Sequence, residues 1–390
     1  MTLKLAKLAG ASTFALALAT LSSAGAEEPL AIAKQGYFFV GGKYATVGDK
    51  QVLSGQAYVE YQIPARLTQP YPLVIVPGAA QTATNFTGTA DGRDGWAQFF
   101  LRRGYAVYIV EQPGRGRSSY QPDTEGPQAF PQLLSVQQRF TASEKYALWP
   151  QARLHTQWPG TGQAGDATFD QFFASQVPFV QKPEVTQALN RDALVPLIDK
   201  LGPIVLMTHS QSGSYGLLAA DQRPNSIQAL LHVEGSAPPV HDIEMLGAPN
   251  WFRYGAVSRP WGLTAIPITY APAAPNASDV AFEQQEEADG PDLAKCWLQK
   301  KPAKQLVNLA KIPIAVVHGE ASFYAPYAHC LIKYMEQAGL HPTWLNLGAM
   351  GIRGNGHMMM LEKNSDQIAE IMEKWVSKVV SEKVAAPVSR

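Results

Sequence analysis

Several features that would point to a particular partner are missing from this sequence. Its 390 residues carry 32 Lys and Arg against 32 Asp and Glu, so the formal net charge at pH 7 is zero. A balanced chain offers no basic field for nucleic acid and no acidic tail. Charged residues make up 16% and hydrophobic residues 46% of the chain, which favours a globular protein over a disordered one.

Cysteine is also scarce, with Cys296 and Cys330 as the two examples. Neither belongs to a C-x-x-C pair, which argues against a metal or redox site, and nothing else in the sequence implies a metal or cofactor. In an oxidising compartment the two could form a disulfide, and two buried free thiols are the alternative. Spacing leaves that choice open, because bridging depends on the distance between the Cα atoms.

Long apolar runs are missing too, apart from one near the N-terminus. Two lysines precede an apolar stretch over residues 9–21, and residues 24–26 follow as an A-x-A cleavage site. The stretch is shorter than the roughly 20 residues that span a bilayer. This layout predicts a signal peptide over residues 1–26 and a secreted or periplasmic mature chain, 27–390, that leaves the membrane after cleavage.

What the chain does contain is a series of short, continuously apolar segments, each followed by a small or polar cluster. Such strands, alternating with helices, indicate a doubly wound, mostly parallel sheet of the α/β class. Residues 36–62 instead alternate as an antiparallel hairpin does. Chemistry in such sheets lies at the carboxyl ends of the strands, where these clusters fall. The expected strands are residues 73–76, 106–110, 204–207, 229–233, 314–317 and 343–347.

Two connections, at about 118–202 and 236–311, are longer than such a sheet requires. Both are rich in aromatic residues and both leave from the edge where the polar clusters gather. We interpret them as cap insertions that shape a pocket within a single domain. Most of their aromatic residues are expected to form the core of the insertions themselves.

The segment VLMTHSQSGSYG holds three serines, Ser210, Ser212 and Ser214, directly after an apolar strand. A nucleophilic serine on a strand-to-helix turn needs small residues two positions before and after it, as in G-x-S-x-G. Ser214 comes nearest to that pattern. Register favours Ser210, because the strand ends just before it and the following helix then reaches a normal length before Pro224. The alternative is a helix-start cluster with capping value only.

A serine hydroxyl needs a base, usually a histidine that a carboxylate orients. In hydrolases built on such a sheet, the chain order is serine, acid, histidine. Among eight histidines, His357 follows the last strand and precedes the last helix, where the base is expected. Glu234 and Glu320 both follow strands and compete for the role of the acid. The residues alone leave that choice open.

An oxyanion hole needs two backbone N–H groups aimed at the developing charge. One is expected from Gln211, the residue after the candidate nucleophile, and the other from the loop 77–80. Within that loop, which reads Pro-Gly-Ala-Ala, we choose Ala79, since small residues allow a close backbone approach. An ordinary turn is the alternative.

Five motifs together resemble the α/β-hydrolase superfamily, and within it the secreted bacterial serine esterases whose oxyanion loop carries two adjacent cysteines. The resemblance implies a triad of Ser210, Glu234 and His357. It departs at residues 77–80, where relatives have His-Gly-Cys-Cys, so the adjacent-cysteine disulfide cannot form here. The motifs are GRGRS at 114–118, FTASEKYALWP at 140–150, HTQWPG at 155–160, HSQSG at 209–213 and GNGHMMM at 354–360.

The sequence therefore predicts a secreted serine carboxylic-ester hydrolase with an α/β-hydrolase fold, acting on a small-molecule ester through an acyl-enzyme. A lactonase or amidase of the same fold is an alternative, because those enzymes use the same chemistry. A non-catalytic binding protein is a further alternative, since a fold does not fix a function. A homodimer is left open.

Overall fold

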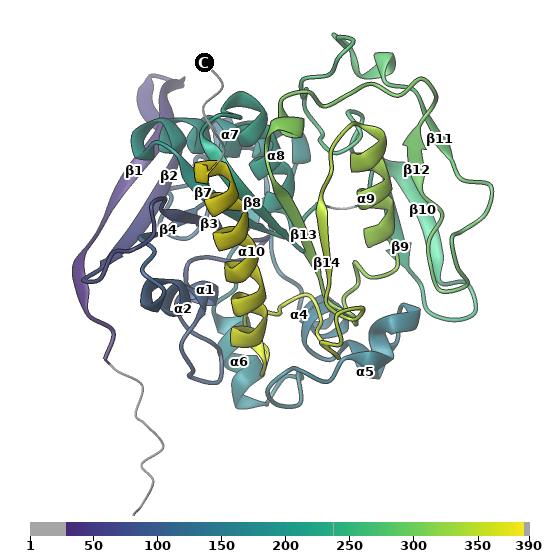
Figure 1. Ribbon diagram of the computed structural model, residues 1–390, viewed down its shortest axis with the longest axis horizontal. Coiled ribbons are helices and arrows are strands. Elements are labelled where there is room, and N and C mark those ends of the chain that lie inside the picture. The colour runs from purple at the N-terminus through teal and green to yellow at the C-terminus, as the bar shows by residue number, and fades with distance from the viewer. Residues whose placement is uncertain (1–28, 237, 386–390) are drawn as a thin grey trace, which may run out of the picture.

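An eight-stranded sheet forms the centre of the computed structural model, which describes residues 29–236 and 238–385. The predicted signal peptide lies outside the described residues. The strand order is β1-β2-β4-β3-β7-β8-β13-β14 (Figure 1). These strands are β1 (Ile32–Val47), β2 (Lys50–Pro64), β3 (Leu73–Val76), β4 (Val107–Glu111), β7 (Ile204–His209), β8 (Ile227–Val233), β13 (Ile314–His318) and β14 (Thr343–Asn346).

The sheet is mostly parallel, as the sequence predicts. The six strands from β4 to β14 pair in parallel with one another. The exceptions are β1 and β2, which form an antiparallel hairpin, and β2 also runs antiparallel to β4. The hairpin is longer at both ends than the predicted segment. No helix among residues 29–236 and 238–385 has the length and apolar character to cross a membrane.

Helices cover both faces of the sheet. Alternate residues of β3 enter opposite cores: Val74 and Val76 pack in one, Leu73 and Ile75 in the other. Side chains of α7 (Pro183–Leu201), α8 (Ser212–Gln222) and α9 (Ala328–Gln337) belong to the first core. Those of α2 (Trp96–Arg102), α6 (Ala167–Ala174) and α10 (Ser365–Ala385) belong to the second. Figure 1 shows α10 running along the near face.

The two long connections carry the remaining elements. Helix α7 lies within the first predicted insertion, yet it packs on the sheet against β1 and β2. The same insertion also holds α3 (Pro122–Glu125), β5 (Gln128–Ala129), α4 (Leu133–Val136), η1 (Gln137–Thr141), α5 (Ser143–Tyr146), η2 (Pro150–Leu154) and β6 (Phe179–Val180). Outside both insertions, the short helix α1 (Thr84–Thr87) follows β3. The second holds β9 (His241–Met245), β10 (Phe252–Val257), η3 (Ala277–Asp279), β11 (Phe282–Gln284), β12 (Trp297–Gln299) and η4 (Leu309–Lys311).

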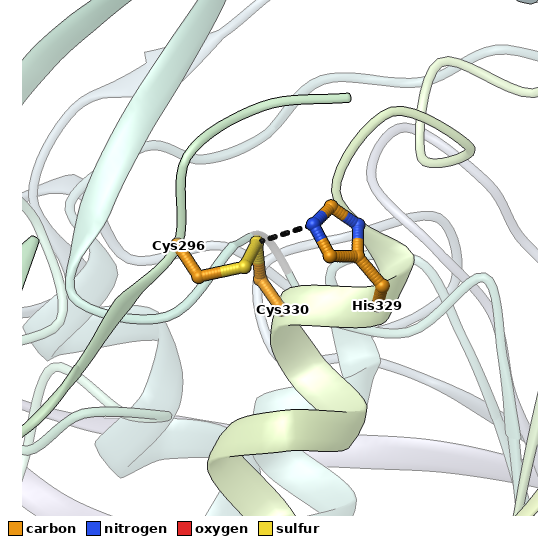
Figure 2. Close-up of side chains that lie close together, drawn as sticks. All are labelled: Cys296, His329 and Cys330. Carbon is orange, nitrogen blue, oxygen red and sulfur yellow. Dashed lines mark hydrogen bonds between the residues drawn. A yellow bond between two sulfur atoms is a disulfide. The ribbon is translucent and has the colours of Figure 1, made fainter. Parts of the chain in front are cut away.

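A disulfide joins Cys296, just before β12, to Cys330 on α9, with their Cα atoms 5.1 Å apart. The bond ties the second insertion to α9, a helix that packs on the sheet. The two cysteines therefore form a disulfide and are not free thiols. His329 lies against it, with Nε2 3.5 Å from Cys330 Sγ (Figure 2). The three side chains have the proximity of a metal site, but a metal ligand must be a thiolate and both sulfurs are bonded to each other.

Candidate active site

Ser210 lies on the sharp turn between β7 and α8. Its φ of +56° is left-handed, a conformation that residues with a side chain rarely adopt. Hydrogen bonds on both sides hold the turn: the Ser210 N–H donates to Val233 O at 3.1 Å, and the Ser210 carbonyl accepts from Ser236 N at 3.2 Å. The turn presents Ser210 at the carboxyl edge of the parallel strands.

The other two serines of the cluster hydrogen-bond within the turn and the helix. The buried Ser212 hydroxyl donates to Val76 O at 2.7 Å and accepts from His209 N at 2.9 Å, which links the turn to β3. The Ser214 hydroxyl donates to Gln211 O at 3.2 Å in the first turn of α8.

The structure brings Ser210, Glu234 and His357 together. His357, from the loop between β14 and α10, has Nε2 2.8 Å from Ser210 Oγ. Its Nδ1 lies 3.0 Å from Oε2 of Glu234, which directly follows β8. Both distances are within hydrogen-bonding range, so the three side chains form a continuous chain in which a proton could move from serine to imidazole.

Both ends of the Glu234–His357 pair are buried, at 1% exposure each. Burial lowers the pKa of His357 below its usual range, so the imidazole is neutral and able to accept a proton. Burial raises the pKa of Glu234, and the hydrogen bonds that Ser322 Oγ and Gly319 N donate to its carboxylate oppose this effect. The Gly319 bond is 2.6 Å long.

Aromatic rings enclose the imidazole. The ring centroid of His357 lies 5.2 Å from that of Phe140, 4.6 Å from Phe323 and 5.1 Å from Tyr324. Phe140 comes from the first insertion, so that insertion contributes directly to the surroundings of His357. The rings fix the orientation of the imidazole and exclude water from it.

Glu320, the rival carboxylate, bonds elsewhere. Its Oε2 accepts a hydrogen bond from Gly354 N at 2.9 Å, and Oε1 pairs with Arg353. Glu320 therefore anchors the loop that leads to His357, while Glu234 contacts the imidazole itself.

The loop 77–80 lies beside the serine. A Cβ added to Gly78 would lie 2.8 Å from Ser210 Cβ, so only glycine permits this approach. The buried Arg115 holds the loop through Nη1 to Gly78 O, and its Nη2 donates to Gln211 Oε1 at 3.0 Å. One side chain thus braces both segments that were predicted to supply the oxyanion donors, Ala79 and Gln211. The sequence analysis missed this role, although Arg115 stands in the GRGRS motif.

A match over most of the chain decides the family. The model of the alpha/beta hydrolase family matches residues 73–371. The chain belongs to this family. The match confirms the predicted fold class and the resemblance that the motifs carry.

Two similar proteins extend this comparison. This α/β hydrolase is 43% identical over 343 residues to a protein described as probable secreted lipase phiG, from Fungal sp. (strain ATCC 74256), covering 88% of this chain and 89% of the relative. It is also similar to a solved structure described as a novel bacterial esterase, with a TM-score of 0.58, 25% identity, and coverage of 91% of this chain and 98% of that one.

Behind the histidine loop of this α/β hydrolase lies a buried polar network. Glu362, fully buried, accepts hydrogen bonds at 2.8 Å from Gly356 N, at 2.8 Å from His155 Nε2 and at 2.7 Å from Asn355 Nδ2. Burial lowers the pKa of His155, but the nearby carboxyl groups of Glu144 and Glu362 outweigh this effect and raise that pKa to about 9. A protonated His155, hydrogen-bonded to the buried Glu362, therefore holds the backbone next to His357.

His209 supports the same loop from the other side. Its Nε2 lies 3.0 Å from the carbonyl oxygen of His357, and its Nδ1 lies 3.2 Å from Gln81 Oε1. Burial lowers the pKa of His209, so the ring is neutral and donates from one nitrogen only. The sequence analysis assigned no role to this histidine; its neighbour Ser210 was the only signal.

A pocket with a volume of about 230 Å³ opens beside Ser210. It lies between the first turns of α7 and α8 and the second insertion. Its lining mixes polar and apolar side chains, and Arg259 is the one charged side chain among the described residues that form it. These residues are Pro183, Thr186, Gln187, Ser210, Gln211, Ser214, Tyr215, Ser236, Ser258, Arg259, Leu263 and Tyr324.

Proposed function

We propose that this protein is a secreted serine carboxylic-ester hydrolase with a triad of Ser210, Glu234 and His357. The observation that carries the proposal is the unbroken path from Ser210 Oγ to His357 Nε2 at 2.8 Å and from His357 Nδ1 to Glu234 Oε2 at 3.0 Å. Membership of the alpha/beta hydrolase family and similarity to proteins described as a secreted lipase and an esterase support it.

In the first half-reaction, Ser210 Oγ attacks the acyl carbon of the ester as His357 Nε2 takes the hydroxyl proton. Collapse of the tetrahedral intermediate breaks the bond to the alcohol oxygen, which leaves with the proton from His357. In the second half-reaction, water gives its proton to His357 and attacks the acyl-enzyme, releasing the acid and restoring Ser210. Glu234 keeps the Nδ1–H oriented and stabilises the imidazolium.

The N–H groups of Ala79 and Gln211 are proposed to stabilise the oxyanion in both half-reactions. Gly78 brings the loop against Ser210, and Arg115 braces the loop together with Gln211. Donors that are fixed in advance need no reorganisation when the charge develops, which is the source of their catalytic value.

A fluorophosphonate probe tests the nucleophile. We expect covalent labelling of the wild type and none of Ser210→Ala. Labelling that survives Ser210→Ala would refute the assignment, and a folded wild type that takes no label and hydrolyses nothing would favour the non-catalytic alternative. A panel of matched short-chain esters, lactones and amides then separates the three reaction types, with the esters expected to react fastest.

Secretion follows from the proposed signal peptide over residues 1–26. Expression of the full chain in a secreting host should yield a mature protein whose mass corresponds to a start at Glu27. A retained N-terminus in the exported protein would contradict the proposed cleavage site.

A further inference from the structure

The pocket beside Ser210 contains a buried cation with an open bonding position. Arg259 lies two residues after the end of β10 (Phe252–Val257) and is 7% exposed. Its Nε donates to Pro238 O at 2.6 Å, and its Nη1 donates to Asp242 Oδ1 at 2.9 Å. Its Nη2 is buried and has no hydrogen-bond partner among the described residues. Two hydrogen bonds thus fix the guanidinium, and its third nitrogen, Nη2, is left without an acceptor in the described part of the chain.

A second unpartnered donor lines the same pocket. The Ser236 hydroxyl is buried and has no partner among residues 29–236 and 238–385. Its backbone is held to the nucleophile turn, since Ser236 N donates to Ser210 O at 3.2 Å. A buried donor without a partner costs free energy, and a charged one costs more, so two of them in one pocket indicate a missing acceptor.

The charges around the pocket select the kind of acceptor. Arg259 is the one charged side chain in the lining. Asp242, which pairs with it, has a side chain 55% exposed to solvent and does not line the pocket. Asp242 therefore screens Arg259 only in part. Near a protein surface, a cation attracts an anion more strongly than it would in bulk water.

We propose that the natural substrate is an ester that also carries a free carboxylate, which Arg259 Nη2 and Ser236 Oγ bind in this pocket. This inference rests on the proposed ester hydrolysis at Ser210. A carboxylate has the acceptor capacity for both donors, and hydrogen bonds between ions are stronger than those between neutral groups. The substrate class is therefore a half-ester of a dicarboxylic acid, or an ester whose alcohol carries the carboxylate.

Two pairs of substrates test this and distinguish the acyl side from the alcohol side. The first compares mono-p-nitrophenyl glutarate with p-nitrophenyl pentanoate. The second compares acetylated p-hydroxybenzoate with its methyl ester. In one of the two pairs, the wild type should prefer the anionic member by about tenfold or more in kcat/KM, the value of a charge-assisted hydrogen bond.

The variant Arg259→Met should remove that preference by slowing the anionic ester while the neutral partner reacts at a similar rate. Arg253→Met is the matched control, because Arg253 lies on β10, shortly before Arg259 in the chain, and pairs with Glu244 at the surface; it should keep the preference. The proposal is overturned if the wild type shows no preference in either pair, or if the preference survives Arg259→Met.

A binding measurement separates failure of this inference from failure of the proposed function. Calorimetry with glutarate and Ser210→Ala requires no turnover, and the double variant Ser210→Ala, Arg259→Met should bind at least tenfold more weakly. If Arg259→Met does not fold, Arg259→Lys keeps the charge but loses the planar fork and should reduce the preference severalfold. Turnover of neutral esters without any glutarate binding refutes the carboxylate site and leaves the esterase standing.

Discussion

Replacing Glu362 by glutamine should destabilise the protein and change how its stability depends on pH. Glu362 is fully buried and accepts three hydrogen bonds, from Gly356 N, His155 Nε2 and Asn355 Nδ2. Glutamine has one acceptor oxygen and an NH₂ group, so at least one buried donor must face another donor. Leaving the buried, protonated His155 without its carboxyl partner costs about 3 to 5 kcal/mol.

The pH dependence follows from His155. Its pKa is about 9 in the folded protein against the ordinary 6.5. Burial lowers this pKa, but the carboxyl groups of Glu144 and Glu362 beside the ring outweigh burial. This difference corresponds to about 3 kcal/mol. Because the folded pKa is raised, the stabilisation is fully present below pH 6.5 and is lost as the pH rises through 9.

Urea unfolding under non-reducing conditions, followed by tryptophan fluorescence at several pH values, measures both effects. The wild type should lose stability between about pH 6.5 and pH 9, and Glu362→Gln should lose most of that slope. Glu370→Gln is the control, since Glu370 is on the surface of α10 in an i, i+4 pair with Lys374 and should change stability by less than about 0.5 kcal/mol. Parallel stability curves for wild type and Glu362→Gln would refute the reasoning.

Four further predictions concern the triad and the disulfide. Ser210→Ala should abolish ester hydrolysis, whereas Ser214→Ala should keep most of it, because that hydroxyl bonds only to the first turn of α8; p-nitrophenyl ester assays decide between them. Glu234→Gln should reduce kcat by orders of magnitude, with Glu320→Gln affecting mainly stability, and the reverse result would transfer the triad acid to Glu320. Because burial lowers the pKa of His357, the acid limb of kcat/KM should lie below pH 6.5. Reducing the disulfide, which spans 34 residues, should lower stability by about 3 to 4 kcal/mol, and an unchanged urea midpoint would contradict that.

The sheet could be predicted from the sequence because each strand is a local signal. The runs at 73–76 and 204–207 are continuously apolar, and both strands are buried along their whole length. Strand register likewise favoured Ser210 over a serine with a better motif. These inferences need only residues that are neighbours in the chain.

The groups that support the site could not be predicted in this way. His155 and Glu362 are separated by 207 residues in the chain, and Arg115 and Gln211 by 96. No periodicity connects such pairs, because their contact exists only after the sheet brings the loops together. The residues alone also could not decide between Glu234 and Glu320 as the triad acid, because both follow apolar strands. Only the resemblance favoured Glu234.

Backbone strain at the strand ends connects the triad to the pocket. Ser210, Glu234 and Ser236 have φ values of +56°, +47° and +59°, and Ala80 in the neighbouring loop has +60°. Glycine would adopt this conformation without cost, whereas each of these residues costs on the order of 1 kcal/mol or more. For Ser210 and Glu234 the cost has a reason, because the proposed chemistry requires their side chains. The same argument applies to Ser236: a strained serine with an unpartnered hydroxyl beside the nucleophile is expected where that hydroxyl contacts the substrate.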